Sequence, residues 1–210
     1  MMAMPEKILR MAPPRVRPWV LLAALVIPDA IAEPLTYRVD PTHTFPMFEI
    51  SHLGFSKHRG RFNGTQGTLT LDLEKKQGQI EIKIDAASID TGHEALEKIL
   101  RSDGFFDVAQ FPDIHFRADR FEFLDQRLQS LHGQLTMKGV TRPITLNVDH
   151  FHCGRPLFQP KPVCGANATT SLLRSDFGLD KYVNFGLGDE VRITIQIEAI
   201  AETEMPSVAP

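Results

Sequence analysis

The sequence predicts an all-β protein, an antiparallel up-and-down barrel of eight strands with one helix at about residues 92–102, at one end of the barrel. Apolar residues recur at every second position in most segments, which is the spacing of a strand with one buried face. Only one segment changes to helical spacing. Because a sheet with one apolar face needs a second layer or closure to bury it, consecutive strands of this kind predict a barrel that encloses a cavity.

The clearest strand is EVRITIQIEAIAE, at residues 190–202. Its alternate positions from Val191 to Ala199 are apolar, the positions between them are polar, and neither Pro nor Gly interrupts the run. Such a segment is typical of a long strand paired on both sides. We therefore expect the earlier segments to supply its two neighbours.

Residues 1–32 have the features of a secretory signal peptide. Four basic residues precede the apolar run WVLLAALVI, and Ala30-Ile31-Ala32 follows it, which predicts cleavage after Ala32 and a mature chain that begins at Glu33. A bilayer span needs about 20 apolar residues, so a permanent membrane anchor is the less favoured alternative. Translation from Met1 or from Met11 gives the same mature chain, and export predicts a periplasmic location.

The mature chain is expected to form one domain over residues 33–202, followed by a flexible tail at 203–210. The whole chain carries a formal net charge of -3. Residues 1–32 hold more basic than acidic side chains, so the mature chain is more acidic still. This charge disfavours nucleic acid as a partner.

Alternation begins at once after the expected cleavage site. Segment 35–40 (LTYRVD) alternates, and segment 42–62 is rich in Phe, with Pro46 indicating an edge or a bulge. Segments 67–74 and 79–85 alternate Leu and Ile on either side of the turn KKQG. These two segments predict a hairpin.

The helix is predicted from the apolar spacing between Ala95 and Leu100. Thr91 is the expected N-cap and Gly104 the expected stop. The flanking segments on both sides have strand periodicity. This is the one clear helix that the sequence predicts.

Strands are expected to resume at 113–123, where the apolar phase changes between Ala118 and Phe121 and predicts a bulge near Asp119 and Arg120. Segments 131–139 and 141–152 then alternate around the turn KGVTRP. Segment 165–182 indicates a weaker strand followed by a loop. With segment 190–202, these give about eight strands.

Four motifs resemble those of the YceI-like family, which are exported polyisoprenoid-binding proteins with an extended lipocalin-like barrel. In chain order they are VDPTHTFPMFEISHLGFSKHRGRFNGTQG, LRSDGFFDVAQFPDIHF, GQLTMKGVTRPITL and RSDFGL, and together they span most of residues 35–200. The resemblance implies a lipocalin-like barrel and a periplasmic carrier or binder of a long isoprenoid, and it brings no established catalytic residues. The insert CGRPLFQPKPVC, from Cys153 to Cys164, departs from the family pattern and inherits no role.

The predicted ligand is a long-chain isoprenoid lipid, for example a polyprenyl or quinone-type molecule. The sequence contains 14 Phe but only one Trp and two Tyr, so inward-facing positions would offer few polar groups. From periodicity alone, a solid core remains the alternative to a ligand cavity. The expected hydrophobic lining is Phe45, Phe48, Ile50, Phe55, Leu69, Leu71, Ile80, Ile82, Phe116, Leu135, Leu146, Phe177, Ile193, Ile195 and Ile197.

Three polar residues are candidates for contact with a ligand head group. Arg174 and Asp176 are two residues apart in RSDFG, where they would point together toward a head group or form a structural ion pair that fixes the loop. His43 lies in DPTHT, among turn-forming residues, so a structural turn histidine is the alternative.

The two cysteines, Cys153 and Cys164, are predicted to form a disulfide because export delivers the chain to an oxidising compartment. The rival is a metal site that combines their thiolates with His150 and His152. We expect neither a metal nor another cofactor to be bound.

The sequence contains none of the common catalytic motifs, such as G-x-S-x-G or H-E-x-x-H. We therefore expect a binding protein and not an enzyme. A metal- or haem-related accessory binder is the second hypothesis, and an enzyme acting on a prenyl substrate is the third. The expected protein has no permanent membrane anchor, and the sequence leaves a monomer and a homodimer open.

Overall fold

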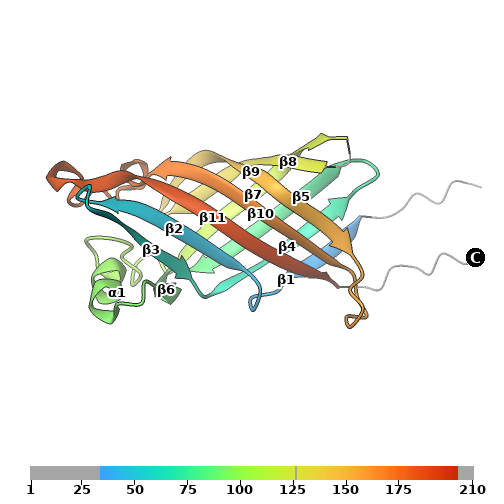
Figure 1. Ribbon diagram of the computed structural model, residues 1–210, viewed down its shortest axis with the longest axis horizontal. Coiled ribbons are helices and arrows are strands. Elements are labelled where there is room, and N and C mark those ends of the chain that lie inside the picture. The colour runs from blue at the N-terminus through green and yellow to red at the C-terminus, as the bar shows by residue number, and fades with distance from the viewer. Residues whose placement is uncertain (1–33, 126, 203–210) are drawn as a thin grey trace, which may run out of the picture. The chain divides into compact units, whose positions relative to one another are not determined.

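Each strand of the barrel is antiparallel to its neighbours, and the last strand closes on the first (Figure 1). The computed structural model describes residues 34–125 and 127–202. Its strands are β1 (Leu35–Val39), β2 (Phe45–His52), β3 (Ser56–Phe62), β4 (Thr65–Asp72), β5 (Gln77–Asp85), β6 (Ile89–Asp90), β7 (Asp113–Leu124), β8 (Arg127–Met137), β9 (Val140–Gly154), β10 (Val163–Leu173) and β11 (Leu187–Ala201). The helix α1 spans Glu94–Arg101, and three 3-10 turns span Ala86–Ser88 (η1), Arg174–Phe177 (η2) and Val183–Phe185 (η3).

The barrel has eight strands because three pairs of short strands each act as one bent strand. Strand β1 pairs with β4 and β2 pairs with β3, while β4 pairs with β5 and β3 pairs with β6. The composite strands β1–β2, β3–β4 and β5–β6 therefore lie side by side, followed by β7 to β11 in chain order. This is the predicted up-and-down barrel.

Strand β11 closes the barrel by pairing on both sides. One side pairs with β10 over its length, and the other pairs first with β2 and then with β1. Tyr37 of β1, for example, lies opposite Ala201. The prediction of a long final strand with two neighbours is confirmed.

Two of the bends are tied together by hydrogen bonds. The bend between β3 and β4 holds Gly64, whose amide donates to Ser88 Oγ at 2.9 Å and whose carbonyl accepts from Asp85 N at 2.8 Å. Asp85 also caps η1 by accepting from Ala87 N at 2.9 Å. Each bend leaves backbone groups without strand partners, and these groups hydrogen-bond to the other bend. The two composite strands therefore bend next to each other.

The β7 bulge lies where the change of apolar phase predicts it. The register of β7 against β8 shifts between Ala118 and Arg120. The extra residue reverses which side chains face inward on the far side of the bulge. The 67–74 and 79–85 hairpin is confirmed as well, by the pairing of β4 with β5.

The helix is shorter than predicted, and a different residue caps it. His93 Nδ1, not Thr91, accepts from Leu96 N at 3.0 Å, while the Thr91 amide donates to Glu97 Oε1 at 2.9 Å. The last turn ends at Ser102, before Gly104. A histidine ring can serve as an N-cap acceptor, which the usual preference for Ser, Thr, Asp and Asn does not anticipate.

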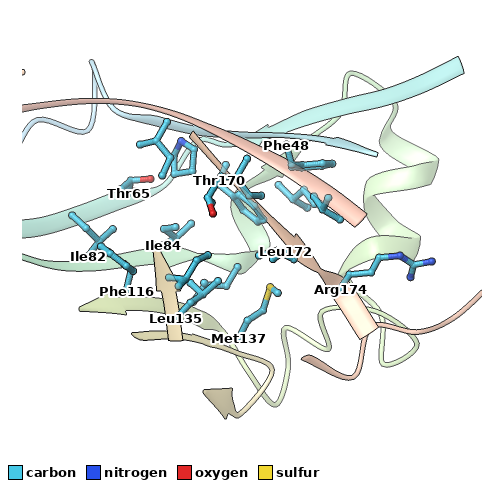
Figure 2. A pocket seen from close by; sticks show the side chains of 18 of the residues that line it. Phe48, Thr65, Ile82, Ile84, Phe116, Leu135, Met137, Thr170, Leu172 and Arg174 are labelled. Atoms are coloured by element: carbon cyan, nitrogen blue, oxygen red, sulfur yellow. The ribbon is translucent and has the colours of Figure 1, made fainter. Parts of the chain in front are cut away.

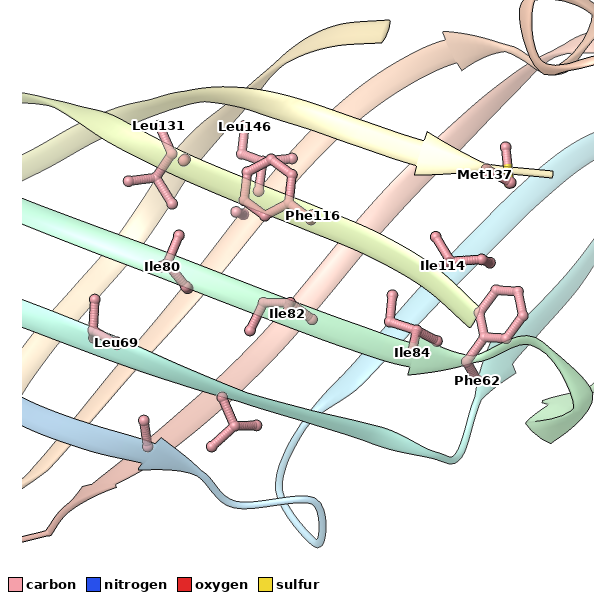
Figure 3. Close-up of a cluster of buried hydrophobic side chains, with 14 of the residues drawn as sticks. Phe62, Leu69, Ile80, Ile82, Ile84, Ile114, Phe116, Leu131, Met137 and Leu146 are labelled. Atoms are coloured by element: carbon pink, nitrogen blue, oxygen red, sulfur yellow. The ribbon is translucent and has the colours of Figure 1, made fainter. Parts of the chain in front are cut away.

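Buried side chains on the inward faces form a continuous cluster across the sheet, with Ile80, Ile82 and Ile84 of β5 in its middle (Figure 3). Near β1 the interior is packed, because Tyr37, Leu71 and their neighbours are buried and do not line the cavity described below. The hollow part lies towards α1.

The predicted signal peptide at 1–32, the mature N-terminus at Glu33 and the tail at 203–210 lie outside the described residues. Within the described part of the chain, no helix is both long enough and apolar enough to cross a bilayer.

Candidate functional site

A cavity of about 260 Å³ occupies the part of the barrel nearest α1 (Figure 2). It is lined by side chains from every described strand except β1, together with side chains from α1 and from the loop that follows it. Nearly all of these side chains are aliphatic or aromatic. A cavity of this composition suits an apolar ligand because it offers few hydrogen bonds to replace those with water.

The inward side chains of β11 show the effect of this cavity on burial. Ile193, Ile195 and Ile197 face the barrel interior, yet each is only partly buried. Ala199 and Ala201, further along the same face, are buried against β1. The same apolar face therefore meets empty space near α1 and packed side chains near β1.

Most of the predicted lining residues line this cavity. They are Phe48, Ile50, Ile80, Ile82, Phe116, Leu135, Leu146, Ile193, Ile195 and Ile197. That these side chains contact a ligand is still a prediction.

Leu69 and Leu71, by contrast, are buried in the solid part of the barrel. They share the inward face with the cavity residues, but they lie opposite Tyr37 and Leu35 of β1. Tyr37 and Leu35 belong to the same packed hydrophobic cluster. Leu69 and Leu71 are therefore core residues.

Phe45, Phe55 and Phe177 also lie away from the cavity. Phe45 is an odd number of positions from Phe48, so it faces outward, where the Arg61 guanidinium lies 4.9 Å from its ring centre. Phe55 lies in the turn between β2 and β3, and Phe177, the last residue of η2, is buried without lining the cavity.

Several lining residues were not assigned to the cavity from the sequence. Leu96 and Leu100 of α1, and Phe105 and Phe106 of the loop after it, close the cavity at its α1 end. The four-residue spacing of Leu96 and Leu100 was the available signal, because it places both on one face of the helix. No pattern in the sequence shows that this face covers the barrel.

Arg174 lies at the α1 end of the cavity, but its donors are used to hold a loop. Nε donates to Gly188 O at 2.7 Å, Nη2 donates to Lys181 O at 3.0 Å, and Nη1 donates to Leu179 O. Burial lowers the pKa of this guanidinium from its ordinary value, and the nearby Asp189 carboxylate opposes that shift. The chain from β10 to β11 is thus fixed around a buried charge.

The structure does not bring Arg174 and Asp176 together. Both belong to η2, where residues two apart point in different directions, and Asp176 is exposed while Arg174 is buried. The expected ion pair is therefore absent from this loop. A different carboxylate, Asp189, accepts from Ser175 N at 2.9 Å and from Ser175 Oγ at 2.7 Å.

His43 belongs to the turn between β1 and β2, outside the cavity lining. Its Nδ1 lies 2.9 Å from Asp40 Oδ2, and Asp40 Oδ1 accepts from Thr42 N at 2.9 Å. The hydrogen bond to Asp40 raises the pKa of His43 above its ordinary value. This is the structural turn histidine that was the alternative to head-group contact.

Cys153 and Cys164 form the predicted disulfide, which joins directly opposed residues of β9 and β10. The bond uses both sulfur atoms, so the rival site that needs their thiolates does not form. His150 and His152 are exposed on β9. In the described part of the chain, no three His, Cys, Asp or Glu side chains are grouped as a metal site would require.

The comparisons with known proteins agree with this fold. The YceI-like domain model matches residues 37–199. Protein YceI of Salmonella arizonae is 30% identical over 184 residues, which are 86% of this chain and 95% of that protein.

Two solved structures share the barrel. The Campylobacter jejuni YCEI protein has a TM-score of 0.60 and 24% identity, and the match covers 74% of this chain and 91% of that chain. A polyisoprenoid binding domain from Saccharophagus degradans has a TM-score of 0.58 and 18% identity, with 80% and 99% covered. The family model and the Salmonella relative confirm the resemblance seen in the motifs, and the chain belongs to the YceI-like family.

Proposed function

We propose that this protein binds a long-chain isoprenoid lipid in the barrel cavity and carries it through the periplasm. The observation that supports the proposal is the cavity itself, which is lined almost wholly by aliphatic and aromatic side chains and ends at α1. Each buried methylene contributes about 0.8 kcal/mol, so a chain of many carbons binds without any ionic contact. The Saccharophagus relative is described as a polyisoprenoid binding domain, which fits the same ligand class.

The binding test uses a charge placed inside the barrel and a matched charge placed outside it. Ile195 faces the cavity, while its neighbour Gln196 is exposed on the outer face of β11. We expect Ile195→Glu to purify without the isoprenoid that wild type retains, because a carboxylate is costly to bury among apolar side chains. Gln196→Glu adds the same charge to the same strand and should retain the lipid.

Organic extraction followed by mass spectrometry measures the lipid, and circular dichroism shows whether each variant is folded. Wild-type lipid content in a folded Ile195→Glu protein would contradict the proposal. A stoichiometric metal in place of lipid would favour the metal- or haem-related alternative. Turnover of an added prenyl substrate would favour an enzyme.

The periplasmic location has its own test. The signal-peptide pattern of residues 1–32 and the Cys153–Cys164 disulfide both fit an oxidising compartment outside the cytoplasm. The intact mass of the protein from the periplasmic fraction should correspond to a chain that begins at Glu33. A mass that includes the WVLLAALVI run would show a retained anchor.

A further inference from the structure

One buried hydroxyl in the cavity has no hydrogen-bond partner. Thr65, the first residue of β4, is 3% exposed, and its Oγ1 bonds to no other described residue. Its side chain lines the cavity, with the hydroxyl facing inward (Figure 2). Buried hydroxyls are nearly always hydrogen-bonded, so an unpaired hydroxyl that faces a cavity indicates a partner that enters the cavity.

The other buried threonine of the lining is already satisfied. Thr44 Oγ1 accepts from Glu198 N at 3.2 Å and donates to Glu198 O at 3.3 Å. Its hydroxyl therefore joins two parts of the barrel and is not available to a ligand. This contrast singles out Thr65.

The two positively charged residues of the lining also have partners already. Arg174 donates to three backbone carbonyl oxygens, and Arg59 is paired with Glu49 at 2.7 Å on the outside of β3. Figure 2 shows Arg174 and Thr65 on opposite sides of the cavity. The surroundings of Thr65 are apolar, with Ile84 directly opposite it on β5.

We propose that the ligand carries a small uncharged polar group, a hydroxyl or a carbonyl, that hydrogen-bonds to Thr65 Oγ1 inside the barrel. A threonine hydroxyl can donate or accept, so it matches either group. A phosphate does not fit there, because one neutral hydroxyl cannot replace the hydration of a charged group. This proposal rests on the proposed function and narrows its ligand to neutral amphipathic isoprenoids.

The test compares three C20 probes that share an isoprenoid chain, namely geranylgeraniol, geranylgeranyl diphosphate and the hydrocarbon phytane. Each is measured by displacement of a fluorescent lipid from delipidated protein. Wild type should bind the alcohol more tightly than the diphosphate. Thr65→Val should weaken the alcohol about five- to tenfold, the value of one neutral hydrogen bond, and leave phytane unchanged.

Two further variants make the result specific. Thr65→Ser keeps the hydroxyl and should keep alcohol binding within about twofold of wild type. Thr170→Val removes another hydroxyl of the lining, which is only partly buried and has a backbone acceptor at 3.5 Å, and should have less effect than Thr65→Val. Thr65→Val should also raise the melting temperature of the ligand-free protein, because it removes an unpaired buried hydroxyl.

Failure of this proposal can be told apart from failure of the proposed function. Equal binding of the alcohol by wild type and Thr65→Val, an equal loss in Thr170→Val, or tighter binding of the diphosphate would overturn the Thr65 contact and leave lipid binding intact. If wild type binds none of the three probes, the proposed function fails as well.

A second, independent observation concerns the surface where the cavity ends. Four large side chains, Leu53, Phe55, Tyr182 and Phe185, are exposed on two neighbouring loops, and we call them the mouth rim. Phe55 is 90% exposed and Phe185 is 79% exposed. The loops lie at the same end of the barrel as α1 (Figure 1) and are joined by a 3.2 Å hydrogen bond from Leu53 N to Gly186 O.

An aromatic path connects the mouth rim to the cavity. Phe105 lines the cavity, its ring centre lies 6.3 Å from that of Tyr182, and Tyr182 lies 6.4 Å from Phe185. Lys181 lies over the rings of both Phe105 and Tyr182. Aromatic side chains beside a lysine are the composition of a surface that enters the interface of a bilayer.

We infer that the mouth rim docks on a lipid bilayer, so that lipid passes between the membrane and the cavity without crossing water. The continuity of the rim with the cavity favours a bilayer over a protein partner, because the ligand of the proposed function is itself a membrane lipid. This inference also rests on the proposed function.

The opposite end of the barrel provides the matched control. Leu157 and Phe158, in the loop between β9 and β10, are 95% and 99% exposed and do not line the cavity. The double variants Phe55→Ser/Phe185→Ser and Leu157→Ser/Phe158→Ser remove similar apolar surface from the two ends (Figure 1). Both sets of residues are exposed, so both proteins should fold.

Vesicles of phosphatidylethanolamine and phosphatidylglycerol are the probe, with binding measured by co-sedimentation. The mouth-rim variant should bind at least about tenfold more weakly than wild type, because two inserted Phe side chains are lost, while the control variant should match wild type. The rim variant should still purify with lipid, which separates docking from cavity binding. Equal effects of the two variants, a larger effect at Leu157 and Phe158, or no vesicle binding by wild type would overturn the inference.

Discussion

Arg174 donates from Nε to the carbonyl oxygen of Gly188 at 2.7 Å, across a loop that joins β10 to β11. The same guanidinium also bonds to the carbonyl oxygens of Leu179 and Lys181. One buried side chain therefore bonds three backbone carbonyl groups, two of them in the loop and one at the start of β11. The loop at the cavity's α1 end depends on this residue.

We accordingly expect Arg174→Met to lower the free energy of unfolding by at least about 2 kcal/mol, because three carbonyl groups lose their donor. Urea denaturation measures the change. Arg174→Lys should be intermediate, since an ammonium group lacks the planar geometry that reaches all three acceptors. Asp176→Asn, exposed in the same turn, is the control and should change stability by less than about 0.5 kcal/mol. A Met variant as stable as wild type would contradict this account.

The division of the barrel into a solid part and a hollow part predicts unequal costs for truncation of apolar residues. Leu71→Ala should cost about 2–5 kcal/mol of unfolding free energy, as is usual for a packed core position. Ile195→Ala should cost at least about 1 kcal/mol less, because Ile195 already borders empty space and has fewer contacts to lose. Both are measured on delipidated protein, since a bound lipid would pack against Ile195. Equal costs would show that the cavity is filled in the free protein.

The disulfide should stabilise its own part of the barrel without being required for the fold or for lipid binding. Cys153 and Cys164 are 11 residues apart, and closing a loop of this length contributes a little under about 3 kcal/mol. The double Cys→Ser variant should therefore be less stable by at most this amount and should bind lipid like wild type, because no residue of the joined loop lines the cavity. Thiol titration of the denatured, unreduced protein should find no free thiol. Two free thiols, or loss of lipid in a folded double variant, would count against this view.

His43 gives a prediction for pH dependence. The hydrogen bond to Asp40 raises the pKa of His43, and the nearby charges of Asp40 and Glu198 act in the same direction. A group with a raised pKa in the folded state contributes its full stabilisation below its ordinary pKa of about 6.5, and this is lost as the pH rises through the folded value. NMR titration of the His43 ring should show the raised pKa. Asp40→Asn should return it toward the ordinary value, whereas an unchanged titration in that variant would contradict the assignment to Asp40.

The sequence alone was sufficient for the elements whose local pattern has one structural solution. Alternation predicted most of the strands, but not that segment 42–62 forms the paired strands β2 and β3. The phase change between Ala118 and Phe121 predicted the bulge, and two cysteines in a chain predicted to be exported led to the disulfide. The helix was found, but its cap was not, because His93 is an uncommon capping residue. In each successful case the deciding interaction lies within the segment or between neighbouring strands.

The cavity depended on information that no single segment contains. Periodicity shows that Leu69 and Ile82 both belong to inward faces, yet Leu69 lies against β1 and Ile82 lines the cavity. Alternation also shows which residues share a face, and Phe45 and Phe48, an odd step apart, cannot both point inward on a regular strand. Arg174 was noticed for its charge, but its carbonyl partners are brought to it by the path of the loop. The sequence by itself therefore determined the strands, their apolar faces and the barrel class. Only the tertiary structure decided where the barrel is hollow and which polar atoms are left unpaired, because these depend on side chains that come from distant segments and meet only when the barrel closes.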